Sequence, residues 1–171
     1  MVQPAQPELP ITHVGLTVPD LDAALVWYAD VLGYVQLTPP GEIICGQGRF
    51  GAITEDIWGN DWSTVRMAHI GSGRGAVIEL FAYPDYDQPD SFEFRRVGFS
   101  HLCVVDSDLE SLAARAVAGG GRQRSQIWTM FENLPYQMVY LEDPWGNAIE
   151  GYSHSHSETY ELGRTTDSSS A

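Results

Sequence analysis

The stretch 13–33, HVGLTVPDLDAALVWYADVLG, changes its hydrophobic period part-way along. Its first part alternates between apolar and other side chains, which is typical of a half-buried strand. Pro19 and Asp20 then suit the start of a helix, apolar residues recur at helical spacing, and Gly33 suits the helix end. A strand followed by a helix is therefore predicted. The strand begins with His13, and a lone histidine in such a run usually packs in the core, so its role depends on partners elsewhere in the chain.

Downstream of this helix, two apolar runs flank a cluster of glycines. The runs TVRMAHI at 64–70 and AVIELFAY at 76–83 predict strands, and GSGRG at 71–75 predicts the turn of a hairpin. These glycines have no following helix and no Lys-Ser/Thr pair, which argues against a phosphate-binding loop. Residues 39–63 are rich in glycine, and we expect strand pieces there, joined by a long loop.

A similar order of patterns returns in the second half of the chain. VGFSHLCVVD at 97–106 predicts a strand, and SDLESLAARAVAGGG at 107–121 predicts a helix. Ser107 and Glu110 have the spacing of a capping box at the start of that helix. YQMVYLED and NAIEGYSHS predict two further strands around the turn DPWGN.

The second half therefore repeats the first. HVGLTVPDLDAALVWYADVLG corresponds to HLCVVDSDLESLAARAVAGG, and GAVIELFAY corresponds to GNAIEGYSH. Such a repeat indicates two copies of one strand–helix–strand–strand–strand unit, each of which needs the other to bury its sheet. The expected boundaries are a lead-in at 1–10, a first module at 11–84, a linker at 85–96, a second module at 97–156 and a disordered tail at 157–171.

Composition excludes several classes of function. The chain of 171 residues carries 23 acidic and nine basic side chains, for a formal charge of −14, and every base is an arginine. Without lysine there is no Schiff-base chemistry and no lysine general base, and an acidic surface disfavours nucleic-acid partners. No apolar run is long enough to span a membrane, and the polar, proline-rich start does not resemble a signal peptide, so we expect a cytoplasmic protein. Cys45 and Cys103 are too few for a disulfide framework.

Two histidines and two glutamates stand at equivalent places of the two repeats. His13 and His101 lie in the first strands, and Glu79 and Glu150 lie in the last strands. An unpaired carboxylate buried in such apolar runs is costly, so it must be neutralised, paired or bound to a metal. Two carboxylates close together would also raise each other's pKa. One divalent transition metal per chain would balance both charges, and imidazole ligands favour Zn, Ni, Co, Mn or Fe(II) over Ca or Mg.

These motifs make the chain similar to a known family. HVGLTVPDLDAALVWYADVLGY, IELF, FSHLCVVDSDLESL and LEDPWGNAIEGY resemble the vicinal oxygen chelate superfamily, which includes glyoxalase I, methylmalonyl-CoA epimerase, extradiol dioxygenases and the fosfomycin- and bleomycin-resistance proteins. The resemblance covers residues 10–155 and implies an α+β fold, in which two tandem βαβββ modules form a cupped eight-stranded mixed sheet. It also implies a metal in the cup, held at the positions of His13, Glu79, His101 and Glu150.

The ligand set separates the branches of this superfamily. The resemblance implies two histidines and one carboxylate in the extradiol dioxygenases and fosfomycin-resistance proteins, no metal set in bleomycin-binding relatives, and generally a glutamine at the place of Glu79 in the epimerase. Bacterial-type glyoxalase I has His, Glu, His and Glu, as here. We therefore expect a glyoxalase-like isomerase, epimerase or lyase that moves a proton next to a metal-chelated oxygen, with Glu150 and Glu79 as catalytic groups. The alternatives are an Fe(II)- or Mn-dependent dioxygenase and a non-catalytic protein that sequesters an aromatic ligand.

The resemblance also implies a small-molecule substrate and a homodimer, with the site built within one chain or shared between chains. The candidates for contact with the substrate are Trp58, Trp62, Cys103, Trp128, Phe131, Tyr152 and His154, with Tyr136 and His156 beside them. Packing or simple surface exposure is the alternative for the aromatic residues, and core packing is the alternative for Cys103. His154 and His156 are either accessory acid/base groups or part of a frayed strand end with incidental metal affinity. His69 faces the strand of Glu79 across the predicted hairpin, where it either contacts the ligands or packs. A thiol cofactor such as glutathione or coenzyme A would need cationic anchors, and the candidates are Arg95 with Arg96 and Arg122 with Arg124.

Overall fold

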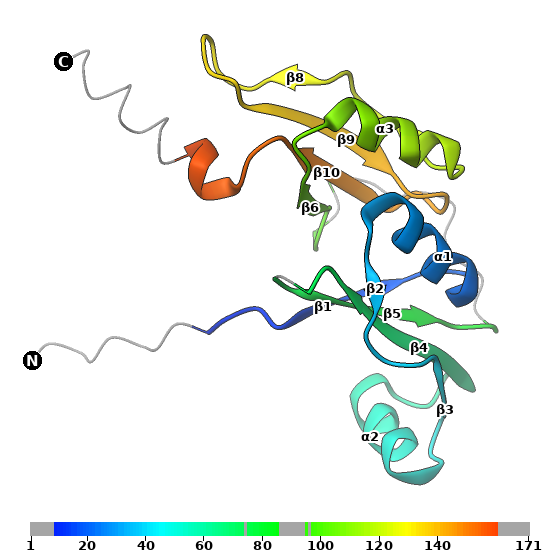
Figure 1. Cartoon of the computed structure of the whole chain (residues 1–171). Coiled ribbons are helices and arrows are strands. Elements are labelled where there is room, and N and C mark those ends of the chain that lie inside the picture. The colour runs from blue at the N-terminus through cyan, green and yellow to red at the C-terminus, as the bar shows by residue number, and fades with distance from the viewer. Residues whose placement is uncertain (1–8, 74, 86–94, 96, 161–171) are drawn as a thin grey trace, which may run out of the picture. The chain divides into compact units, whose positions relative to one another are not determined.

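The computed structural model describes residues 9–73, 75–85, 95 and 97–160. The chain divides into two compact units, Met1–Ala29 with Gly33–Asp87 and Asp30–Leu32 with Gln88–Ala171. Each unit has a five-stranded sheet of its own (Figure 1).

The first sheet contains the predicted parallel pair and hairpin. Its strands run in the order β1-β5-β4-β2, with β3 also paired to β4. β1 is parallel to β5, and β4 is antiparallel to β5, which confirms the hairpin predicted around the glycines. The elements are β1 (His13–Thr17), α1 (Leu21–Leu32), β2 (Val35–Gln36), β3 (Gly41–Ile44), α2 (Gly48–Trp58), β4 (Thr64–Gly71) and β5 (Val77–Ala82).

Helix α1 begins and ends where its sequence predicts. The Asp20 carboxylate accepts a hydrogen bond from the backbone N–H of Ala23 at 3.0 Å, which caps the first turn. Gly33 ends the helix at φ 68°, a left-handed conformation that glycine adopts without steric cost. Asp22 in the first turn also accepts two hydrogen bonds from the Arg66 guanidinium on β4, so this end of α1 is tied to the sheet.

The glycine-rich segment after α1 differs from its prediction. Pro39 and Pro40 separate the short strands β2 and β3, because proline has no N–H to donate to a ladder. The predicted long loop is wrong over residues 48–58, which form helix α2. Gly51 lets this helix approach β3, since a Cβ there would lie 2.1 Å from the carbonyl oxygen of Ile44. The helix escapes sequence detection because its N-cap, Gln47, makes no side-chain cap and its first turns contain glycines.

The second unit repeats the order of the first. Its strands run β6-β10-β9-β7, with β8 also paired to β9, and β6 is parallel to β10. Helix α3 packs on β7, β9 and β10. The second strand of the unit is again broken into two pieces, because the backbone N–H groups of Arg124 and Ser125 both bond to the Tyr140 carbonyl. The elements are β6 (Leu102–Val105), α3 (Leu109–Ala118), β7 (Arg122–Gln123), β8 (Trp128–Thr129), β9 (Gln137–Glu142) and β10 (Ala148–Tyr152).

The start of α3 is one residue later than predicted. Asp108 is the N-cap, and its carboxylate accepts a hydrogen bond from the Ser111 N–H at 2.9 Å, so the capping box of Ser107 and Glu110 is wrong. Asp106 holds this turn by accepting from the Asp108 N–H at 3.0 Å. Its other oxygen accepts from Arg115 at 2.7 Å.

The tail begins with ordered structure. Residues 156–160 form a helical turn, in which Thr159 is 1% exposed and donates a hydrogen bond to the Ser155 carbonyl. The predicted disorder is therefore wrong for residues 157–160, and 161–171 lie outside the described residues. Most of the predicted linker, at 86–94 and 96, also lies outside them, as do residues 1–8 of the lead-in. No helix in the described part of the chain is long and apolar enough to cross a membrane.

The carboxylate of Asp106 makes a testable contribution to stability. Burial alone would raise its pKa, but the Asp108 N–H and the Arg115 guanidinium outweigh it and hold the pKa below its ordinary value. A lowered folded-state pKa stabilises the fold above the unfolded pKa of about 3.9, and this contribution is lost as pH falls through the folded value. We expect Asp106→Asn to lower the free energy of unfolding by about 1 kcal/mol at pH 7, a figure already discounted for partial exposure.

Urea unfolding at pH 7 and at pH 3 measures this difference. The gap between wild type and Asp106→Asn should shrink at the lower pH, because pH 3 lies below the unfolded pKa and the contribution of the Asp106 charge to stability is being lost as pH falls towards the folded value. Asp22→Asn is the matched control: it also faces an arginine, but Asp22 is exposed, so a smaller change is expected. An equal deficit for Asp106→Asn at both pH values would contradict the electrostatic explanation.

Candidate functional site

Glu79 lies on the open face of the first sheet. Along β5 the side chains of Ile78, Leu80 and Ala82 are buried, whereas those of Glu79 and Phe81 are half-buried on the opposite face. This alternation is the period-two pattern of a strand with one solvated face. The carboxylate is therefore accessible to a ligand.

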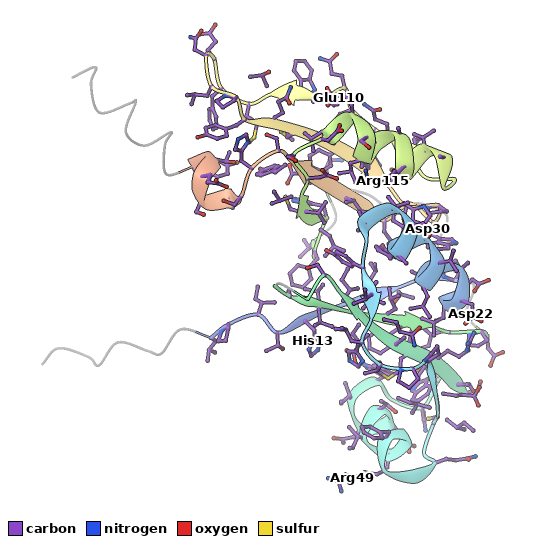
Figure 2. All side chains as sticks on the ribbon, in the orientation of Figure 1. His13, Asp22, Asp30, Arg49, Glu110 and Arg115 are labelled. Carbon is purple, nitrogen blue, oxygen red and sulfur yellow. The ribbon has the colours of Figure 1, made fainter. Side chains whose placement is uncertain are left out.

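Each oxygen of the Glu79 carboxylate faces one histidine. Oε2 lies 3.5 Å from Nε2 of His13 on β1, which Figure 2 labels, and Oε1 lies 3.2 Å from Nε2 of His69 on β4. Glu79 stands directly opposite His69 and directly opposite Gly15, so His13 reaches it diagonally. The structure thus brings His13 and Glu79 together, as the sequence predicts. Of the two alternatives for His69, contact with a candidate ligand or simple packing, it shows contact with Glu79.

Thr38 contacts both the backbone and the ring of His69. Its hydroxyl oxygen accepts a hydrogen bond from the His69 backbone N–H at 3.0 Å and lies 3.1 Å from Nδ1 of the same ring. The Glu79 carboxylate only accepts hydrogen bonds, so its contact with the ring is a hydrogen bond in the tautomer that carries the proton on Nε2, and Nδ1 then accepts from the Thr38 hydroxyl. Nε2–H remains to donate to Glu79, so in this tautomer His69 orients the carboxylate and keeps Nε2 unavailable to a metal.

Glu150 occupies the equivalent place in the second unit. Its side chain is 8% exposed, and Oε2 lies 3.2 Å from Nε2 of His101, which stands just before β6. It lies opposite Cys103 on β6 and Tyr140 on β9, on the face away from α3. The buried carboxylate is thus paired with a histidine, as the cost of burying an unpaired charge requires.

Tyr140 and Cys103 act as neutral donors to Glu150. Burial first, then the charge of Glu150 and a hydrogen bond to it, raise the pKa of Tyr140 above its ordinary value. The same causes raise the pKa of the Cys103 thiol to about 12, so this thiol is uncharged at neutral pH. The Cys103 residue keeps solvent-exposed surface while its thiol is partly buried beside Glu150, so it does not pack fully in the core. Tyr140 was not predicted from sequence; the available signal was its place before the DPWGN turn, at the same distance from the turn as Glu150, which pairs the two residues across the hairpin.

The two clusters correspond position by position. In both, a glutamate in the last strand has a histidine diagonal to it, at or just before the start of the parallel neighbour, and a polar ring opposite on the antiparallel neighbour. They differ at two places, which makes the repeats chemically distinct. The matched positions are His13 and His101, Glu79 and Glu150, Gly15 and Cys103, and His69 and Tyr140.

The donor chemistry of the two His–Glu pairs fits a transition metal. Nδ1 of His13 lies 3.2 Å from the Thr12 hydroxyl, and Nδ1 of His101 lies 2.9 Å from the Ser100 hydroxyl. A partner at Nδ1 that leaves Nε2 directed at a ligand position is the usual arrangement of metal-binding histidines. In the described part of the chain, no group of three or more His, Cys, Asp or Glu side chains is arranged to hold a metal ion. Neither His–Glu pair is therefore part of a complete set of metal ligands in the described residues.

The aromatic candidates fall into separate groups. Trp58 on α2 packs edge-on against Trp62, Phe81 and Tyr83, with ring centroids 5.6, 5.4 and 6.0 Å away. Trp62 donates its Nε1–H to the Gly59 carbonyl. This group lies in the first unit, beside Glu79 on β5.

The second group surrounds the end of β10. Tyr136 packs against His154 at 4.9 Å and against Phe131 at 6.4 Å. The Tyr152 hydroxyl lies 3.1 Å from that of Tyr160 in the C-terminal turn, and Tyr152 shares the face of Glu150. Trp128 is 54% exposed on β8. His156 stacks at 4.5 Å on the Tyr160 ring.

Two of the four arginines predicted to bind an anionic cofactor form ion pairs with a glutamate. Arg122 and Arg124 both bind the carboxylate of Glu142, which is 6% exposed. The two arginines therefore balance the buried charge of Glu142, which disfavours them as binding groups for a thiol cofactor. Arg95 is exposed, and Arg96 lies outside the described residues.

Comparison with known proteins identifies the family. Residues 10–150 match the Glyoxalase/Bleomycin resistance protein/Dioxygenase superfamily. The chain belongs to this superfamily. No curated protein sequence matches it.

Solved structures of this superfamily share the fold. A glyoxalase family protein from Bacillus cereus superposes with a TM-score of 0.70 at 15% identity, over 88% of this chain and 97% of that one. A glyoxylase/bleomycin resistance protein/dioxygenase domain from Frankia sp. EAN1pec has a TM-score of 0.60 at 24% identity, over 87% of this chain and 100% of that one. Glyoxalase I from Zea mays has a TM-score of 0.60 at 19% sequence identity. The match covers 85% of this chain but only 45% of the Zea mays chain.

These likenesses confirm the predicted α+β glyoxalase-like fold. The expected single eight-stranded sheet is replaced by two five-stranded sheets. Each sheet has five strands because the second strand of each module is broken into two short pieces that both pair with one long neighbour, β4 or β9.

Proposed function

We propose that this superfamily member is a metal-dependent isomerase, epimerase or lyase of the glyoxalase type. The observation that supports it most is the pair of equivalent His–Glu contacts, at 3.5 Å for His13 with Glu79 and 3.2 Å for His101 with Glu150. Together they provide two imidazoles and two carboxylates, the set that resembles bacterial-type glyoxalase I. The proposal holds whether the two pairs at one metal come from one chain or from two copies.

The proposed ligands are His13, Glu79, His101 and Glu150, with Zn, Ni, Co, Mn or Fe as the ion. When bound, the metal would polarise adjacent oxygens of the substrate and acidify the C–H beside them. The Thr12 and Ser100 hydroxyls would hold the rings of the two histidines. His69, fixed by Thr38, would hold the carboxylate of Glu79 through Nε2–H.

Glu150 is the proposed base. The C–H bond of the substrate breaks, its proton moves to the carboxylate of Glu150, and the proton is returned to the same or the neighbouring carbon. Burial keeps water away from this carboxylate, and the neutral donors Tyr140 and Cys103 hold it in place. Positioned proton transfer of this kind contributes about 10²–10⁴-fold in rate. Glu79, the less buried of the two, is its partner.

Solvent exchange tests this function directly. Metal-reloaded protein in heavy water should introduce deuterium beside the carbonyl of a suitable α-hydroxycarbonyl, hemithioacetal or 2-substituted acyl thioester, as observed by NMR. Oxygen consumption without exchange would favour the Fe(II)- or Mn-dependent dioxygenase. Tight binding of aromatic compounds without turnover or metal would favour a drug-sequestering protein. This third candidate is kept because the chain has two groups of packed aromatic side chains.

We also propose a homodimer. The superfamily resemblance and the need to cover sheet edges both favour it. Light scattering at micromolar concentration should give about twice the chain mass of 18.9 kDa. A monomer mass at that concentration would contradict this proposal and leave the metal-site proposal untouched.

A further inference from the structure

An aromatic wall stands next to the His–Glu cluster of the first unit. It consists of Trp58, Phe81 and Tyr83, all half-buried, with Trp62 behind Trp58. Phe81 follows Glu79 by two positions on β5, so both side chains leave the same face of the sheet. A molecule held at Glu79 would therefore lie alongside these rings.

Gly15 allows the Phe81 ring to lie close to the carboxylate. A Cβ at position 15 would be 3.3 Å from Cε2 of Phe81, so the ring occupies the space that a side chain there would need. Gly15 is also the residue directly opposite Glu79. The second unit has Cys103 at the matching place and Tyr152 in place of Phe81, and Tyr152 directs its hydroxyl to Tyr160.

Helix α2 makes the wall specific to the first unit. It carries Trp58 at its C-terminal end, and the described second unit has no helix between its short strands β7 and β8. The contact of Gly51 with the backbone of Ile44 fixes α2 against β3, which is paired to β4. Trp58 is therefore held on a rigid element.

We propose that the substrate carries an aromatic ring next to its chelating oxygens and that this ring packs against Trp58 and Phe81. The inference rests on the proposed function and names its substrate class. Aromatic pairs contribute beyond the area they bury when they meet edge-to-face or offset. Anionic carriers such as glutathione or coenzyme A are disfavoured, because the chain carries a charge of −14 and Arg122 and Arg124 serve Glu142.

Two hydroxamates that differ mainly in one phenyl group test the proposal. Both benzohydroxamate and acetohydroxamate chelate a metal through two adjacent oxygens. Titration calorimetry with Zn²⁺-loaded protein should show benzohydroxamate binding at least about tenfold tighter, with quenching of tryptophan fluorescence. Trp58→Ala should abolish that preference and leave acetohydroxamate affinity unchanged, whereas the control Phe50→Ala, which removes an exposed aromatic ring from the same helix, should retain it.

The outcomes separate the two proposals. Equal preference in wild type and Trp58→Ala, with both compounds bound, overturns the aromatic substrate class and leaves the metal-dependent function standing. Binding of neither compound overturns both. If Trp58→Ala also weakens acetohydroxamate, helix α2 is disturbed, and Phe81→Leu, which keeps an apolar side chain on β5, then decides: unchanged preference in that variant overturns the proposal.

Discussion

Replacing Glu150 by glutamine is expected to reduce substrate C–H exchange with heavy water by on the order of 10²-fold or more. Glutamine keeps the shape of the side chain and one oxygen ligand but cannot accept the proton. The Tyr140 hydroxyl and the Cys103 thiol can still donate to the amide oxygen, so the fold and much of the metal content should remain. NMR measurement of deuterium incorporation, on protein matched for metal content, gives the ratio.

Glu79→Gln is the matched variant in the other repeat. It recreates the ligand set that resembles methylmalonyl-CoA epimerase, so its effect should be milder. The structure adds a reason, because His69 Nε2–H can still donate to the oxygen of a glutamine at this position. A fully active Glu150→Gln protein would rule out Glu150 as the base. A larger loss of exchange in Glu79→Gln than in Glu150→Gln would indicate that Glu79 is the base and Glu150 its partner.

Loss of the metal is the second large effect expected. Elemental analysis of wild type should show close to one equivalent of a transition metal per chain, and His13→Ala or His101→Ala should remove it. Each substitution leaves a carboxylate without the imidazole that faces it at 3.5 or 3.2 Å. Unchanged metal content in both variants would eliminate the proposed ligand set.

Two other histidines provide the controls. His156 is exposed in the C-terminal turn and contacts Tyr160, so His156→Ala should retain the metal. His69→Ala should keep a metal site of about 10–100-fold lower affinity, because the variant retains all four proposed ligands and loses only the side chain that orients Glu79. A loss as complete as that of His13→Ala would show that His69 binds the metal itself.

Much of the fold follows from local pattern. The change of period at 13–33 predicts β1 and α1 with their cap at Asp20 and their stop at Gly33, because both depend on near neighbours in the chain. The internal repeat predicts the second unit, and it also selects His13, Glu79, His101 and Glu150 from among all polar residues. The sequence can select these positions because period-two alternation shows which face a strand residue occupies.

Tertiary structure alone decided which groups meet across that face. Contacts such as Thr38 with His69 and Tyr140 with Glu150 depend on strand order and register, and the first joins positions 31 residues apart. Helix α2 was hidden because its glycines and uncapped start lower its helix propensity, and it forms by packing on β3. The aromatic wall beside Glu79 required both α2 and β5, which no local pattern connects. By itself the sequence determined the repeated strands, their faces and the candidate ligands, whereas long-range pairing and packing determined their neighbours.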